Sequence, residues 1–187
     1  PPRSTLFPYT TLFRSKIKPL LGGPEDSKKY LEPNSIDTIY VFFGALNTCG
    51  ELEKAIFEMS KVMKPGGRIV ATFVNKWYAF DILWNIIMLR PNKAINRLRK
   101  EWTGYSPTRS LASRCYSARQ IHDIFKKYLT KKHRIGYCIT HPAWYRHHWA
   151  PYLSHRSKFL YKLDALLQWT PLWNLGEYSL YIYEKPE

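Results

Sequence analysis

Apolar runs near the middle of the chain predict a strand, a helix and a second strand in succession. Residues 36–43 (IDTIYVFF) are apolar on both faces, as in a buried parallel strand, and residues 68–74 (RIVATFV) have the same character. Between the two runs, apolar residues recur every three to four positions and predict one buried helical face: Leu52, Ala55, Ile56, Met59 and Met63.

Short polar and turn motifs mark the ends of these elements. Residues 48–51 (TCGE) and 117–120 (SARQ) have the spacing of a capping box, which predicts a helix starting after each. Residues 64–67 (KPGG) end the first helix, because proline cannot continue it and glycine accepts a left-handed turn. A strand, a helix, a tight turn and a strand together predict a βαβ unit with parallel strands.

The rest of the chain mixes helical and strand patterns. Residues 77–89 predict a helix, and a basic amphipathic piece follows through Lys100. Further on we expect a third strand over 134–140 and a helix over about 155–169. Residues 177–184 (EYSLYIYE) alternate enough to be an edge strand.

The pattern of elements indicates an α/β domain, and composition indicates that the chain is folded and belongs in a reducing compartment. Hydrophobic residues make up 45% of the 187 residues and charged residues 23%, which excludes a mostly disordered chain. The three cysteines have no paired spacing, so we expect no disulfide framework. No apolar run approaches the roughly 20 residues of a membrane span. We therefore expect a cytoplasmic location.

Residues 1–15 (PPRSTLFPYTTLFRS) do not look like part of a protein domain. They repeat Thr-Leu-Phe, contain no acid and follow no helical or strand period. Back-translation of residues 5–15 allows a string that resembles a sequencing adapter. We therefore exclude 1–15 as a non-native segment, take 16–187 as a partial domain, and expect the natural N-terminus to have been lost.

The central motifs resemble class I S-adenosylmethionine-dependent methyltransferases. The matching residues are 34–37 (NSID), 42–48 (FFGALNT) and 62–67 (VMKPGG). The resemblance implies a Rossmann-like sheet, S-adenosylmethionine as cofactor, a small-molecule acceptor and a helical lid over about 75–114. The family's glycine-rich turn and the acid that ends its second strand have no counterpart here. We therefore expect a sheet lacking its first strands, and weak cofactor binding.

The resemblance also implies the residues of the cofactor site. They are Gly23, Pro24, Glu25 and Asp26, in a loop on the adenine side, and Phe42, Phe43 and Gly44, at the end of the first predicted strand. In an open parallel sheet, ligands bind beyond the carboxyl ends of the strands. From the residues alone, Phe42 and Phe43 could equally be core residues, with Gly44 only ending the strand.

The acceptor is expected to meet aromatic side chains from two segments. The candidate contacts are Asn47, Trp77, Tyr78, Trp84 and Tyr145, which suit an aromatic or lipophilic acceptor. A lid that buries its own apolar face, and an Asn47 that caps the backbone, remain as alternatives. His141 is the candidate base. Its spacing from the neighbouring histidines matches no zinc pattern, so we expect no metal site.

The formal net charge of +15 raises a second class of function. Two basic clusters, at 90–100 and 126–134, could belong to a non-catalytic RNA-binding or membrane-surface-binding protein. No nucleic-acid motif accompanies them, so a solvated face is the default interpretation and we expect no nucleic-acid partner. The apolar helix and basic successor at 77–100 also fit peripheral contact with a membrane.

Overall fold

The fold is built on a four-stranded sheet. The computed structural model describes residues 18, 20–102, 112–143 and 155–187. The strands lie in the order β1-β2-β4-β3, and their bounds are β1 Ile36–Val41, β2 Met63–Val74, β3 Thr130–Tyr137 and β4 Tyr178–Glu184. β1 pairs with β2 in parallel, and β4 is antiparallel to both β2 and β3.

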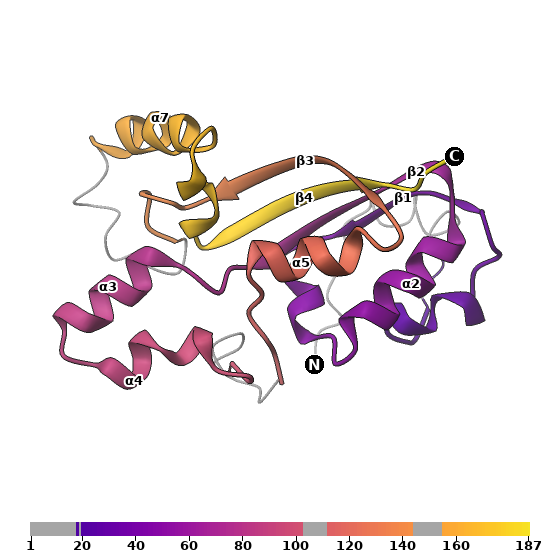
Figure 1. Ribbon diagram of the computed structural model, residues 1–187, viewed down its shortest axis with the longest axis horizontal. Helices are drawn as coiled ribbons and strands as arrows, with labels where there is room; N and C mark the ends of the chain where they lie inside the picture. The colour runs from indigo at the N-terminus through magenta and orange to yellow at the C-terminus, as the bar shows by residue number, and fades with distance from the viewer. Residues whose placement is uncertain (1–17, 19, 103–111, 144–154) are drawn as a thin grey trace, which may run out of the picture.

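Two helices, α2 (Leu52–Val62) and α5 (Ala118–Phe125), bury their apolar faces against the sheet (Figure 1). Phe125 stacks on Tyr183 of β4 at 4.5 Å between ring centroids. The remaining elements are η2 (Pro24–Lys29), η3 (Ala45–Thr48), α3 (Ala79–Ile87), α4 (Pro91–Ala94), η4 (Asn96–Leu98), α7 (Ser157–Leu167) and η6 (Pro171–Leu175). Of these, η2 packs against α2, and η6 packs against β3 and α7.

The parallel pair and the helical patterns are confirmed. Tyr40 of β1 lies opposite Val70 of β2, as two strands running side by side in one direction require. The predicted face of α2 is buried. Ser117 and Gln120 form the expected capping box at the start of α5, with the Ser117 hydroxyl accepting from the Gln120 amide. These features depend on residues close in sequence, or on one alternating pattern.

Five predictions about single elements are wrong. The second strand, β2, begins at Met63 and not at position 68, so residues 64–67 belong to the strand and not to a turn. The last strand, β4, is not at the edge, because β2 and β3 pair with its two sides. The strand β1 is at one edge of the sheet, and its residues are half-buried or exposed where the sequence predicted a buried strand. The third strand begins at Thr130, four positions early. The residue before α2 is Glu51 and no side chain caps it, while Thr48 bonds its hydroxyl to the carbonyl of Ala45 instead.

Candidate functional site

The candidate site lies at the carboxyl ends of the strands. Because β1, β2 and β3 run in one direction, these three ends meet the same edge of the sheet, the one toward which β3 points in Figure 1. Ligands of open α/β sheets bind at such an edge. The helices α3 and α4 lie beyond it (Figure 1).

The turn after β1 is left-handed and exposes two aromatic rings. Phe43 has φ +56° and Gly44 has φ +70°. The Gly44 amide donates to the Thr72 hydroxyl at 3.3 Å, and a Cβ on Gly44 would lie 2.8 Å from Cγ2 of Val74. The exposed fractions are 46% for Phe42 and 77% for Phe43. The two rings are therefore outside the core, and a non-glycine residue in the left-handed region is the kind of strain found at ligand sites.

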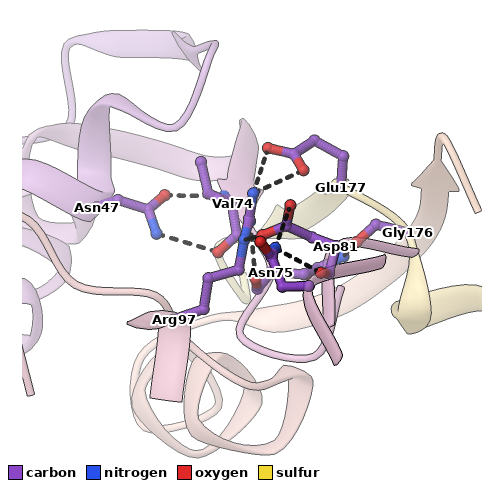
Figure 2. A network of polar contacts seen from close by, with 8 residues as sticks. Asn47, Val74, Asn75, Asp81, Arg97, Gly176 and Glu177 are labelled. Atoms are coloured by element: carbon purple, nitrogen blue, oxygen red, sulfur yellow. Dashed lines mark hydrogen bonds and ion pairs between the residues drawn. The ribbon is translucent and has the colours of Figure 1, made fainter. Parts of the chain in front are cut away.

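Asn47 joins three segments through its side-chain amide. Oδ1 accepts from the Val74 amide at 2.9 Å, and Nδ2 donates to the carbonyls of Val74 and Arg114 at 3.2 and 2.7 Å (Figure 2). The Arg114 amide in turn donates to the Asn47 carbonyl. Backbone groups therefore engage both ends of the buried amide. In this structure Asn47 therefore positions the end of β2 and the segment around Arg114 that lies beside it.

The end of β2 carries a buried ion-pair network (Figure 2). Arg97, which is 4% exposed, donates through Nη2 to both carboxylate oxygens of Glu177 at 3.0 and 2.8 Å. Its Nε lies 3.5 Å from Oδ2 of Asp81, and its Nη1 donates to the Asn75 carbonyl. Asn75 itself donates to the carbonyl of Gly176. The network fixes the 75–97 segment to the start of β4.

Aromatic rings enclose the Arg97 guanidinium. Its central carbon lies 5.0 Å from the ring centroids of both Tyr78 and Trp102, a cation–π distance. Phe80 stacks between Tyr78 and Trp84. Tyr78 is therefore a core residue of this segment, as the alternative of a self-burying lid expected. Trp77 is exposed and Trp84 is half-buried.

The start of η2 contacts the segment that follows the Phe42–Gly44 turn. Gly23 precedes η2, whose first residues are Pro24, Glu25 and Asp26. The Cys49 thiol, just after η3, donates to Oε2 of Glu25 at 3.7 Å. Burial, and then the Glu25 carboxylate, raise the pKa of Cys49. The structure thus joins the 23–26 loop to the chain that follows the Phe42–Gly44 turn, two groups that the sequence assigned to one cofactor site.

His141 lies apart from these groups. It follows β3, and its ring stacks on Tyr161 of α7 at 4.6 Å, while Nδ1 lies 2.9 Å from the Pro142 carbonyl oxygen. β3 and β1 are the two edges of the sheet, about 14 Å apart at ordinary strand spacing. Tyr145 lies outside the described residues. His141 is therefore close to α7, and among the described residues its hydrogen-bond and ring contacts are with Pro142 and Tyr161.

Neither a metal cluster nor a membrane helix is found within the described ranges. No three His, Cys, Asp or Glu side chains there come together as metal ligands. None of the helices in these ranges combines the length and apolar character that crossing a bilayer requires. The chemistry that the described residues offer at the sheet edge is therefore aromatic surface, backbone amides and the carboxylate of Glu25.

The fold is similar to solved S-adenosylmethionine-dependent methyltransferases. One from Thermotoga maritima has a TM-score of 0.54 at 14% identity and covers 95% of this chain and 70% of that one. Another, from Methanosarcina mazei, has a TM-score of 0.51 at 10% identity, with 89% and 66% covered. The (4+2)-cyclase SpnF has a TM-score of 0.52 at 14% identity, with 95% and 60% covered.

These likenesses establish the fold and no more. The chain has a Rossmann-like α/β fold of the methyltransferase type, and it spans about two thirds of the length of the structures it matches. No protein-family profile and no curated protein matches the sequence. A cyclase among the similar structures shows that this fold by itself does not fix the reaction.

Sequence reasoning missed the residues that hold the edge together. The sequence places Arg97 in a solvated basic cluster and Glu177 at the start of a predicted strand, yet the two form a buried pair across 80 positions. Asn75, also buried, was not singled out. A cation among Trp, Tyr and Ile side chains was the one available signal for Arg97, because burial among aromatics demands a counter-charge.

Proposed function

We propose that the protein carrying this chain transfers a methyl group from S-adenosylmethionine to a small aromatic or lipophilic acceptor. The observation that carries the proposal is the exposed, left-handed Phe42–Gly44 turn at the carboxyl edge of a methyltransferase-type sheet. The bound cofactor would supply an electrophilic methyl group on a sulfonium. The residues present fit one wall of its site: the Phe42 and Phe43 rings, the backbone at Gly44, and Glu25 beside Cys49.

The contribution of the chain would be alignment and exclusion of water. Methyl transfer from a sulfonium is an in-line displacement, so holding donor and acceptor in line can supply much of the acceleration. The Phe42 and Phe43 rings would cover the reacting groups and attract the sulfonium cation through their faces. On the acceptor side, Trp77 and Trp84 offer aromatic surface. Asn47 would act by positioning the backbone behind them.

An acceptor hydroxyl or amine would also need a base, and His141 remains the candidate. Because Nδ1 is close to the Pro142 carbonyl, Nε2 is the nitrogen that would take the proton. This role requires an acceptor that extends along the edge from β1 toward β3. An acceptor without an acidic proton would not need His141.

Calorimetric titration of the chain with S-adenosylmethionine tests the proposal. We expect saturable but weak binding, because neither a glycine-rich turn nor a ribose-binding acid is encoded. Phe43→Asn should weaken it about fivefold by removing a ring from the cofactor wall. Asn tolerates the left-handed conformation of Phe43, so the fold should be kept.

Two matched measurements make the result decisive. Phe159→Asn removes another well-exposed ring, from α7, at 66% against 77% for Phe43, and should leave binding unchanged. NAD serves as the rival ligand, since Rossmann-like sheets also bind dinucleotides. Preference for NAD, equal losses in the two Phe variants, or no saturable binding of S-adenosylmethionine would each contradict the proposal.

A further inference from the structure

The end of α3 exposes an uninterrupted run of apolar side chains. Ile86, Ile87, Met88 and Leu89 are all exposed, Ile87 by 71% and Leu89 by 88%. We call residues 86–93, which join α3 to α4, the α3–α4 tip. A run of four exposed apolar residues opposes solubility unless the surface has a function.

Leu89 has a left-handed backbone conformation, in which glycine or asparagine would be more stable than leucine. Its φ is +53°. The Leu89 amide donates to the Ile86 carbonyl, and the Arg90 amide donates to the Asn85 carbonyl at 2.8 Å. These two bonds are the Schellman ending of a helix, in which the left-handed residue is usually glycine or asparagine. Leucine there costs conformational free energy and adds apolar surface in water, so neither packing nor backbone geometry accounts for it.

The tip and the segment that follows it carry exposed cations without acidic partners among the described residues. Residues 82–100 contain no Asp or Glu. Arg90, Lys93, Arg99 and Lys100 are exposed. None of these four forms an ion pair within the described part of the chain. The fifth cation of this stretch, Arg97, is buried against Glu177 and holds the base of the tip to the sheet.

The second basic cluster is different. Lys126, Lys127 and Lys132 pair with Asp123, Glu53 and Glu184, respectively. Such pairs belong to an ordinary solvated face. Only the tip, of the two clusters, combines cations that lack acidic partners among the described residues with exposed apolar side chains.

We propose that the α3–α4 tip docks onto an anionic lipid surface. Ile86, Ile87 and Leu89 would enter the boundary between head groups and acyl chains, and Arg90 and Lys93 would bind the lipid head groups. Interfacial elements need both signals, since apolar insertion or charge alone gives weak and reversible binding. This inference does not depend on methyl transfer.

Charge favours this occupant over two others. In a two-fold pairing of tips from two copies, Arg90 and Lys93 would face the same cations with no acid between them. A nucleic acid would satisfy the cations but leave the apolar run in water. An anionic bilayer satisfies both the apolar run and the cations.

Co-sedimentation of the chain with phosphatidylcholine vesicles, with and without phosphatidylserine, tests the docking. We expect binding that requires phosphatidylserine and weakens with added salt. Leu89→Asn should lower the affinity about tenfold, while the free energy of unfolding stays the same or rises because Asn suits the left-handed position. The double variant Arg90→Gln/Lys93→Gln should lower the affinity at least about tenfold.

The control has the same charge change at another place. Lys158→Gln/Lys162→Gln removes two exposed lysines from α7 and should lower the affinity less than the tip variant does. Equal losses would assign binding to overall charge and overturn the proposal. Vesicle binding whose affinity does not change when phosphatidylserine is left out, or when Leu89 is replaced by Asn, would also overturn it. Two outcomes without vesicle binding would equally overturn the proposal. One is a dimer that Leu89→Asn dissociates, and the other is RNA binding that only the charge variant abolishes.

Discussion

The two parallel strands end at the same edge of the sheet in opposite ways. After β1, Phe42 and Phe43 expose their rings from a left-handed backbone. After β2, Arg97 and Glu177 bury opposite charges at 4% and 1% exposure (Figure 2). The end of β1 has a strained backbone and exposes an aromatic surface. The end of β2 has a buried ion pair that fixes a segment in place.

The difference separates a fixed side of the edge from an open side. A buried ion pair is specific in geometry, because either charge alone in that environment is strongly unfavourable. Arg97 can therefore hold α3 and α4 to the sheet in one arrangement. The Phe42–Gly44 turn is held by the bond from its glycine amide to the Thr72 hydroxyl and leaves its two phenylalanine rings exposed, which suits a surface that a ligand is to cover. Asn47 connects the two sides through Val74.

The largest expected effect is at the fixed side. Arg97→Met should lower the free energy of unfolding by about 3–5 kcal/mol, because Glu177 would keep a buried carboxylate without its partner. Urea denaturation measures the change. Arg99→Met, two positions along and exposed, is the control and should stay within about 0.5 kcal/mol. If the two substitutions cost the same, the end of β2 is not a fixed side.

Asn47, which links the two sides, should contribute nearly as much to the free energy of unfolding. Asn47→Ala removes the bonds to the Val74 amide and to the carbonyls of Val74 and Arg114. We expect a loss of about 3 kcal/mol, because buried backbone groups would lack partners. Thr48→Ala, which removes one local and exposed bond, should cost under about 1 kcal/mol. Thermal and urea unfolding of both variants compare them, and a small effect of Asn47→Ala would mean that the two ends are independent.

Two glycines with nearly the same φ allow a test of how closely the backbone at Gly44 approaches Val74 of β2. Gly44 has φ +70° and Gly66 has φ +72°. A Cβ on Gly66 meets nothing within 4 Å, whereas one on Gly44 would lie 2.8 Å from Val74. Gly66→Ala should cost about 1–2 kcal/mol from the left-handed conformation alone. Gly44→Ala should cost about 1–2 kcal/mol more from crowding. Equal costs in urea unfolding would show that the turn is not pressed against β2.

At neutral pH the smallest effect concerns the two thiols, one at each end, which change stability only in alkaline solution. Burial raises the pKa of Cys115, packed with Val74 and Trp102, from 9.0 to about 12. The unfolded chain therefore loses this proton first. The contribution of the Cys115 thiol to stability is fully present below pH 9. It falls as the pH rises from there toward the pKa of the thiol in the folded protein. Between these two values, Cys115→Ala should make the alkaline loss of stability shallower by about 1.4 kcal/mol per pH unit.

Cys49 is the matched thiol at the open side. It is half-buried, and its pKa is raised mainly by burial and then by Glu25. Cys49→Ala should therefore change the alkaline slope less than Cys115→Ala does, and a thiol reagent should label Cys49 first in the native protein. Faster labelling of Cys115 would contradict the assignment of a closed and an open side.

Much of the sheet could be predicted because its signals are local. The runs at 36–43 and 68–74 are short and apolar, and the helix face that begins at Leu52 follows the helical period. A right-handed crossover then favours the parallel pair. The position of Phe42 and Gly44 at the carboxyl edge follows from that unit. Their binding of the cofactor remains a prediction.

The errors come from interactions between distant residues. The alternation at 177–184 is the same for an edge strand and a central antiparallel strand, so the place of β4 between β2 and β3 was not readable from it. The exposure of β1 depends on which strands lie beside it. Arg97 resembles its neighbours Arg99 and Lys100 in sequence, and burial against partners such as Glu177, 80 positions away, makes it different.

The sequence by itself determined the βαβ unit, the capped α5 and the glycine that the turn after β1 requires, since each depends on backbone preferences and periodicity within a few residues. The tertiary structure decided which charges are buried, which strand is at the edge and which aromatic rings face water. Those outcomes depend on desolvation and on partners brought together by the fold, and neither is a property of a residue in its local segment.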